Sequence, residues 1–294
     1  MNAIKTFLLL FALTALFVLV GQRLAGNDGM IIALIFAAAI NFFAWWFSDK
    51  LILAVTGAKP AADGDLQNVR RILSGLAISN NMPLPKLYVM ETQMPNAFAT
   101  GRNPSNAAVA VTRGIVSLLS DEELKGVMAH ELAHIRNRDT LISTVAATVA
   151  GAIFMLARMA QWAMIFGGRG GGRNTRRGGG EMLIMAIFAP LAAMLIQMAI
   201  SRSREFSADK SGAALSGDPM ALASALRKLA AGIRLNSVEP SPVTNHLYIV
   251  HPFGGKSAFA LFSTHPPVEE RIRRLEAMAS KAAEAKYSVP KIIH

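Results

Sequence analysis

The chain of 294 residues contains no cysteine. Disulfide bridges and cysteine-based zinc sites are therefore excluded, and histidine and carboxylate side chains remain as ligands for a transition metal. Charge is also scarce, because Asp, Glu, Lys and Arg together make up 17% of the residues. Hydrophobic residues make up 52%, and the mean hydropathy is +0.37. This composition is too apolar for an ordinary soluble fold, so it predicts a membrane protein.

Acidic residues are outnumbered, with 19 Asp and Glu against 30 Lys and Arg and a pI near 10.3. Such a balance suits either nucleic acid or the anionic head groups of lipids, and the hydrophobic stretches favour lipid. A Gly-rich stretch, Gly167 to Gly180, carries several arginines and is similar to flexible RNA-binding segments. It lacks interleaved aromatic residues, so we expect a connector near lipid head groups and no nucleic-acid partner.

Two uncharged stretches near the N-terminus, Thr6–Gln22 and Gly29–Ser48, are each about long enough to cross a bilayer. The second ends in two tryptophans and a phenylalanine, as is typical of a membrane interface. A cleaved signal peptide is the alternative, but no small-x-small cleavage site stands out and a second stretch follows quickly. We expect residues 1–50 to form a transmembrane hairpin. Lysines outside its loop favour both ends in the cytoplasm.

A soluble segment is expected from about Ala61 to Asp139. Its sequence predicts a helix near Leu66–Ala77 and strands at Lys86–Met90, Asn96–Thr100 and Ala107–Thr112. Pro and Gly residues mark the turns between these elements. A small sheet should therefore precede the motif that follows.

The sequence His130-Glu131-Leu132-Ala133-His134 is the most specific motif in the chain. On a helix its spacing places two imidazoles on one face, one turn apart, where they can hold a single Zn²⁺. Glu131 then lies near the open coordination position, where a carboxylate can act as a general base. A Ser-Asp-Glu-Glu sequence at 120–123 reads as a capping box. The motif is therefore expected on a helix.

A catalytic zinc usually has three protein ligands, and Glu205 is the candidate for the third. Two further apolar stretches, Thr140–Ala157 and Met182–Ser201, lead away from His134 and back again, so an antiparallel hairpin would return Glu205 to the histidines. This argument holds whether or not that hairpin spans the bilayer, which the sequence leaves open. Asp209, one turn later, could accept the other N–H of a zinc-bound histidine. A solvated face paired with nearby basic residues is the alternative for both acids.

His265 precedes two prolines and a charged helix that begins at Val268. It could line the cleft and hydrogen-bond a developing oxyanion, or it could set a turn ahead of the helix. These two interpretations stay open. The remaining histidines outside the motif, His246, His251 and His294, are expected at the surface.

The chain resembles the HtpX family of membrane-bound zinc metalloproteases, relatives of the prenyl-protein (CAAX) endopeptidase. The resemblance covers most of the chain and depends on the order and spacing of its motifs. These are the N-terminal hairpin, Asn96-Ala97-Phe98-Ala99-Thr100-Gly101, the run from His130 to Asp139, the second apolar pair, Glu205 to Asp209, and Thr264-His265-Pro266-Pro267 with Arg271-Ile272.

The resemblance implies a multi-pass protein of the bacterial inner membrane, with one zinc held by His130, His134 and Glu205, and Glu131 as catalytic base. The site would face the cytoplasm and act on unfolded or misfolded proteins during stress. The resemblance also suggests that Asn96 to Thr100 forms a sheet edge on which the substrate lies. Charged residues around the motif favour a site at or above the membrane surface over one inside the bilayer.

The expected fold is mainly α-helical with a small β-sheet, built as a gluzincin-like metalloprotease domain. This domain would cover residues 51–294, interrupted by a hydrophobic hairpin at about 140–201. The expected function is that of a membrane-bound zinc endopeptidase. The alternatives are a non-catalytic zinc-containing scaffold or regulator and, further behind, a membrane-anchored RNA-binding protein. Natural substrates and oligomeric state do not follow from the sequence.

Overall fold

The computed structural model describes residues 2–140, 202–235, 249 and 266–287. These residues fall into two compact units, of which the first is an N-terminal helical hairpin. The second contains Ser48–Thr140 and the described residues from Arg202 onward. The expected hydrophobic hairpin at 140–201, the Gly-rich stretch, His265 and the three other histidines predicted at the surface lie outside the described residues.

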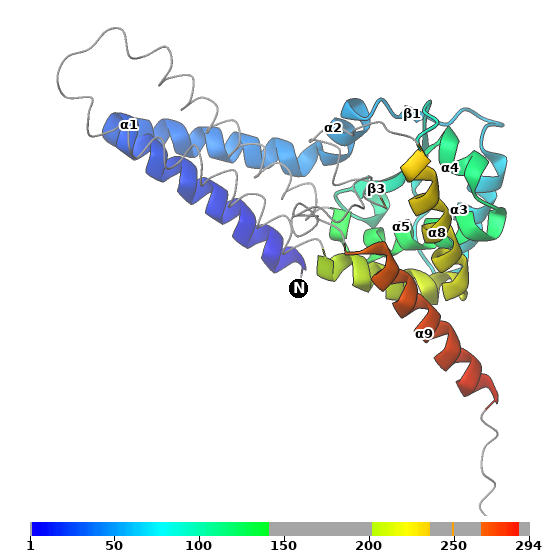
Figure 1. Cartoon of the computed structure of the whole chain (residues 1–294). Helices are drawn as coiled ribbons and strands as arrows, with labels where there is room; N and C mark the ends of the chain where they lie inside the picture. Colours follow the sequence, from blue (N-terminus) through cyan, green and yellow to red (C-terminus); the bar gives the residue numbers. More distant parts are fainter. Residues whose placement is uncertain (1, 141–201, 236–248, 250–265, 288–294) are drawn as a thin grey trace, which may run out of the picture. The chain divides into compact units, whose positions relative to one another are not determined.

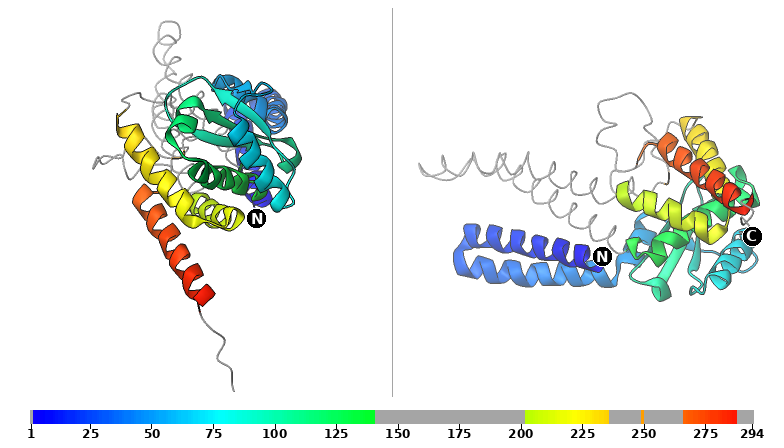
Figure 2. Two further views of the ribbon diagram at one scale, coloured as in Figure 1. Left: turned by 90° about the vertical axis from the view of Figure 1, so that its right-hand side faces the viewer. Right: turned by 90° about the horizontal axis from the view of Figure 1, so that it is seen from below.

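The first unit is α1 (Asn2–Trp46), which doubles back on itself at Ala25 and Gly26 (Figures 1 and 2). Gly26 has a φ of 61° and a ψ of −143°, a conformation that glycine adopts without steric cost. The break falls between the two apolar stretches predicted from the sequence. The arms approach closely, since a Cβ on Gly21 would lie 2.3 Å from the carbonyl oxygen of Gly29.

Few polar contacts join the arms of α1, and its outer surface is apolar. Asn41 Nδ2 donates to Thr14 Oγ1 at 2.9 Å, so these two polar side chains pair between the arms of the hairpin. Several large hydrophobic side chains are exposed on the outside, including Phe7, Phe11, Ile32, Ile35 and Phe43. Among the described residues, Ala25–Phe43 is the one helical segment long and apolar enough to cross a membrane, with a mean hydropathy of 1.6.

The second unit contains a four-stranded sheet in the order β1-β2-β4-β3. The strands are β1 (Lys59–Pro60), β2 (Lys86–Met90), β3 (Ala97–Gly101) and β4 (Ala107–Thr112). β2 and β4 are parallel, whereas β3 is antiparallel to β4 and lies at the edge of the described sheet. The predicted bounds of β2 and β4 are confirmed, and β3 begins and ends one residue later than predicted.

Helices cover both faces of this sheet. One face packs against α2 (Ser48–Val55) through Ile52 and Leu53. The other face carries the main core, to which α3 (Gln67–Ser79), α5 (Asp121–Arg136), residues 202–216 and α8 (Pro219–Leu235) all contribute. The short helix α4 (Arg113–Leu118), the 3₁₀ turn η1 (Pro104–Asn106) and α9 (Val268–Tyr287) complete the described elements. All six residues of β4 are buried, because β4 is an inner strand of the sheet and helices cover both of its faces.

Helix α5 carries the His130–His134 motif, and its start is fixed by the predicted capping box. Ser120 Oγ accepts from the backbone N–H of Glu123, and the Glu123 carboxylate accepts from the N–H of Ser120 at 2.9 Å. Glu123 also binds Lys228 of α8 at 2.7 Å. The capping box therefore stabilises the first turn of α5, and Glu123 also connects α5 to α8.

Two glycines allow the helices around α5 to approach at backbone distance. A Cβ on Gly126 would lie 2.6 Å from the backbone nitrogen of Leu222 in α8. A Cβ on Gly212, in the helical residues 202–216, would lie 2.8 Å from Cα and 2.9 Å from N of His130. The helix that carries Glu205 and Asp209 is thus seated directly against the backbone of the histidine motif.

Replacing Gly212 with alanine should separate these two helices, because the atoms that the new methyl group meets are backbone atoms that cannot rotate away. We expect a destabilisation of about 1–3 kcal/mol, measured as a lower melting temperature of the purified chain in detergent. Gly75→Ala is the matched control. Gly75 is exposed in α3 with open space around it, and alanine there should stabilise by about 0.5–1 kcal/mol. A Gly212→Ala chain that melts like wild type would contradict the packing argument.

Candidate metal centre

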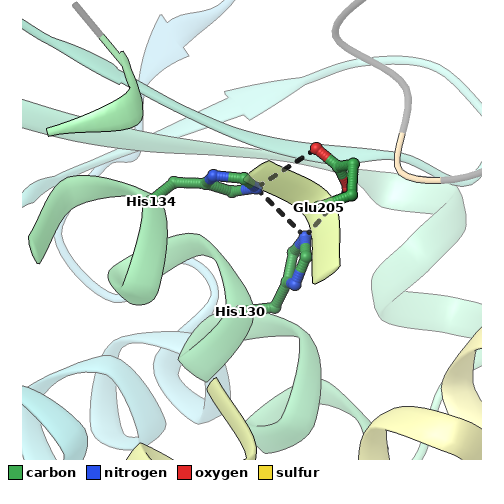
Figure 3. A group of neighbouring side chains, drawn as sticks. All are labelled: His130, His134 and Glu205. Carbon is green, nitrogen blue, oxygen red and sulfur yellow. Dashed lines mark hydrogen bonds and ion pairs between the residues drawn. The ribbon is translucent and has the colours of Figure 1, made fainter. Parts of the chain in front are cut away.

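The structure brings the three predicted ligands, His130, His134 and Glu205, into one group (Figure 3). The Nε2 atoms of the two histidines lie 3.2 Å apart. Each lies 3.6 Å from a different oxygen of Glu205. Ligand atoms at about 2.0–2.1 Å from a tetrahedral zinc are separated from one another by roughly 3.3 Å. The spacing of the three donors therefore matches that of a zinc site.

Local structure explains why these side chains meet. The two histidines lie one turn apart on α5, so their rings point to the same side of the helix. Glu205 comes from the helical residues 202–216, which pack against α5 at Gly212. His130 is 1% exposed, and the side chain of His134 is 15% exposed. The group therefore has a buried side at His130 and a more open side at His134.

Both imidazoles have a carboxylate at the nitrogen that faces away from Glu205. Asp209 Oδ1 lies 3.1 Å from His130 Nδ1, in a close electrostatic contact rather than a well-directed hydrogen bond. Asp139 Oδ2 lies 3.2 Å from His134 Nδ1. A carboxylate in this position fixes the tautomer of a metal-bound histidine and leaves Nε2 to bind the ion. Asp209 was predicted for this position, whereas Asp139 was not singled out.

Asp139 reaches His134 because the chain turns sharply after α5. Arg138 has a φ of 57°, in the left-handed region that a non-glycine residue seldom adopts. The turn brings the residue five positions after His134 back to its ring. Residues with a strained backbone conformation of this kind are often found at functional sites. The sequence signal that could have identified Asp139 is an acid close behind the second histidine of the motif.

Arg271 of α9 is the second residue that sequence analysis did not place at the site. It is 1% exposed and forms a bidentate pair with Asp209, with distances of 2.9 Å and 2.7 Å. Its Nη1 atom also lies 3.4 Å from Glu205 Oε2. A signal was available, because Arg271 occupies the apolar stripe of α9 between Val268 and Leu275, where a charged residue is unexpected.

The charge of the group favours a divalent cation. Four carboxylates are buried here, those of Glu131, Asp139, Glu205 and Asp209. Among the described residues, the basic groups next to them are the guanidinium groups of Arg271 and the half-buried Arg204. With neutral histidines, two negative charges are left over. A Zn²⁺ ion would neutralise them, so the residues present fit this ion.

The same excess of negative charge affects the pKa of His130. Burial disfavours its charged form, but Asp209 and Glu205 outweigh burial and raise the pKa of His130 to about 9. The pKa of Asp209 is lowered to about 2, because Arg271 and His130 together outweigh the effect of its burial. The site thus attracts a positive charge to the position between His130 and the two acids.

Glu131, between the two histidines on α5, is buried, with 3% of its surface exposed. Burial is the largest cause of its raised pKa, and the nearby histidines and a hydrogen bond from the backbone N–H of Ala99 act in the other direction. Ala99 is the middle residue of the edge strand β3. The candidate base is therefore hydrogen-bonded to the edge strand of the sheet.

The comparisons with known proteins agree with this geometry. The profile described as "Peptidase family M48" matches residues 64–279, which contain all the residues of the site. The chain belongs to peptidase family M48. It is 51% identical over 277 residues to the protein named "Protease HtpX homolog" of Syntrophobacter fumaroxidans, covering 93% of this chain and 98% of that one. It is 50% identical to the protein of the same name from Thermodesulfovibrio yellowstonii, covering 96% of this chain and all of the relative.

The M48 fold is also seen in a solved structure, the crystal structure of Ste24p from S. mikatae. The TM-score is 0.54 and the identity 20%, over 90% of this chain. At this identity the likeness is one of fold, and this chain spans 62% of the length of that one. With its family and its His-His-Glu group, the chain is a zinc metalloprotease, as the sequence predicts.

Zinc binding by this M48 peptidase should depend on pH. The pKa of His130, near 9, lies above its ordinary value of 6.5, so without metal the residue keeps a proton at pH 7. That proton must leave before the imidazole can bind zinc. Zinc affinity should therefore rise between pH 7 and 9, by up to about tenfold per unit, and level off above.

This pH dependence can be measured by competition with a chelator calibrated at each pH. The Glu131→Gln variant is suited to it, because it should prevent self-cleavage during the titration. An affinity that stays constant from pH 7 to 9 would contradict the raised pKa of His130.

Proposed function

We propose that the chain is an endopeptidase that hydrolyses unfolded or misfolded proteins, membrane proteins among them, at the surface of the bacterial inner membrane. His130, His134 and Glu205 hold one zinc ion, Glu131 acts as general base, and Asp209 and Asp139 orient the histidines. The observation that carries the proposal is the triangle of donor atoms at 3.2 Å, 3.6 Å and 3.6 Å beside a buried glutamate.

The chemistry follows from the positions of these groups. When bound, zinc would polarise a peptide carbonyl and lower the pKa of a coordinated water toward about 7. Glu131 accepts a proton from the attacking water and delivers it to the departing amine. The raised pKa of Glu131 suits both steps, because a group that titrates closer to neutral pH can take up a proton and then release it.

The edge strand β3 supports the binding of an extended peptide. Residues opposite each other in an antiparallel pair alternate in the direction of their backbone groups. Asn96 faces β4, because its carbonyl accepts from the N–H of Thr112 at 2.9 Å. Ala97, Ala99 and Gly101 must then face away from β4. The contacts that Ala99 makes with Glu131 and Gly101 with Thr140 agree with this assignment.

A substrate strand added along β3 would therefore meet the backbone of Ala97 and the carbonyl group of Ala99, whose N–H already donates to the proposed base Glu131. Recognition through main-chain hydrogen bonds tolerates many side chains. This breadth suits a protease that removes damaged proteins of many sequences. Asn96, Ala97, Phe98, Ala99 and Thr100 thus form the proposed substrate strand, of which Ala99 is partly exposed and the others are buried.

The proposed location is the bacterial inner membrane, with several spans and the active site on the cytoplasmic side. The apolar outer surface of α1, its candidate span Ala25–Phe43 and the bacterial relatives support membrane attachment. The orientation is based on the lysines that flank the hairpin. The head groups of anionic lipids would also attract a chain with a net charge of +11.

Replacing Glu131 with glutamine should leave zinc bound and remove hydrolysis, because the amide keeps the shape of the side chain but cannot accept the proton. We expect about one zinc per chain in both proteins, and a loss of at least 10²-fold in the cleavage of casein. Glu122→Gln is the matched control, since Glu122 is exposed on the same helix. Equal cleavage by wild type and Glu131→Gln would assign the activity to a contaminant and favour a non-catalytic scaffold.

The orientation can be tested by cysteine labelling, since the chain has no cysteine of its own. Asp28→Cys places a thiol at the hairpin turn, and Lys125→Cys places one on the exposed side of α5. A membrane-impermeant maleimide should label Asp28→Cys in intact spheroplasts. It should label Lys125→Cys only after the spheroplasts are lysed. The reverse pattern would place the active site outside the cytoplasm, and equal labelling of both in spheroplasts would exclude a hairpin that crosses the membrane.

A further inference from the structure

Arg271 is the most deeply buried Lys or Arg side chain of the described residues, and neither the metal site nor the proposed catalytic steps require an arginine at this position. It lies on α9, where Val268, Ile272, Leu275 and Met278 form the side that packs on the core. At 1% exposure, its guanidinium has exchanged water for protein partners. A buried charge of this kind is costly unless most of its N–H groups are satisfied, so its partners indicate why it is there.

One set of partners leads to the metal ligands. Nε and Nη2 donate to the two oxygens of Asp209, at 2.9 Å and 2.7 Å. The same carboxylate contacts Nδ1 of His130 at 3.1 Å. Nη1 lies 3.4 Å from Glu205 Oε2. Nη2 also lies 3.4 Å from His130 Nε2. Arg271 thus contacts two proposed ligands, Glu205 and His130, directly, and it reaches His130 a second time through Asp209.

The other partner leads to the proposed substrate strand. Nη1 of Arg271 donates to the carbonyl oxygen of Ile249 at 2.8 Å. The N–H of Ile249 in turn donates to the side-chain oxygen of Asn96 at 3.3 Å. Asn96 pairs with Thr112 at the beginning of the β3–β4 ladder. A continuous set of hydrogen bonds therefore runs from the start of β3 through Ile249 and Arg271 to Asp209.

We propose that Arg271 is a positioning residue that sets the metal ligands and the substrate strand in register with each other. The planar guanidinium can serve a bidentate carboxylate and a backbone carbonyl at the same time. An ammonium group at this position would keep the charge but could not keep this geometry. The inference builds on the proposed function, since it assumes zinc at His130, His134 and Glu205.

The test measures zinc affinity in the full chain, purified in detergent and carrying Glu131→Gln to prevent self-cleavage. Arg271→Lys and Asp209→Asn are made singly and together. Arg273→Lys is the control, because Arg273 is exposed on the same helix and pairs with Glu270. We expect each single change at Arg271 or Asp209 to weaken zinc binding by about 10–100-fold, and the control to leave it unchanged. The double variant should lose less zinc affinity than the product of the two single losses, because both changes break the connection at Asp209.

Three results would overturn the proposal. They are zinc affinity within threefold of wild type in Arg271→Lys, losses that multiply in the double variant, and unchanged affinity in Asp209→Asn. The third does not depend on the folding of Arg271→Lys, whose metal-free melting temperature is recorded beside that of wild type. Failure of the proposed function gives a different pattern, in which wild type binds zinc no better than His134→Ala. Wild-type binding that is lost in His134→Ala but unaffected by Arg271→Lys would contradict the inference alone.

The strand end of the connection has its own readout. In the catalytically active background, with saturating zinc, Arg271→Lys should raise KM for casein by several fold, because the start of β3 loses its link to α9. Arg273→Lys should leave KM unchanged. An unchanged KM in Arg271→Lys, with zinc fully bound, would separate the substrate strand from Arg271 and overturn this half of the proposal.

Discussion

Compensation of buried negative charge is the constraint on which the site depends. Glu131, Asp139, Glu205 and Asp209 are each at most 6% exposed, and such a cluster would repel itself without positive partners. The protein supplies some of these through guanidinium groups and protonates His130 when no metal is bound. A bound divalent ion would supply the remainder. The same acids that would destabilise an empty site therefore create its affinity for a divalent metal.

Close helix packing is what allows segments far apart in the chain to share this site. The histidines come from α5, Glu205 and Asp209 from residues 202–216, and Arg271 from α9. At Gly212 the missing side chain lets one backbone rest on another, so the ligands are placed by helix positions more than by side-chain flexibility. Such placement limits the reorganisation that metal binding requires.

Much of the fold could be predicted because the relevant signals are local. The short apolar runs of β2 and β4, the capping box at Ser120 and the spacing of the two histidines each depend on residues a few positions apart. Glu205 could also be anticipated, from the expectation that two apolar stretches run out and back. The two-residue strand β1 and the short helices α2 and α4 gave no such periodic signal, since each is too short to show one.

The missed site residues differ from these in kind. Asp139 reaches His134 through the left-handed conformation of Arg138, and a backbone angle of this kind at an arginine has no sequence signature. Arg271 joins the site across 62 residues from Asp209. Its position on an apolar stripe marked it as unusual, but the identity of its partner depended on how α9 packs. Long-range polar networks are therefore the part of the site that the sequence conceals.

In the proposed function, the edge strand β3 also determines which chains can act as substrate. A stably folded protein has already used the hydrogen-bonding groups of its strands and helices on itself, and natural sheets protect their edges. A strand partner for Ala97 and Ala99 has to arrive with its own backbone unsatisfied. Under the proposed function, the geometry of this strand edge would distinguish damaged chains from intact ones without contacting a particular side chain, so the folded state of the substrate would be the signal for recognition.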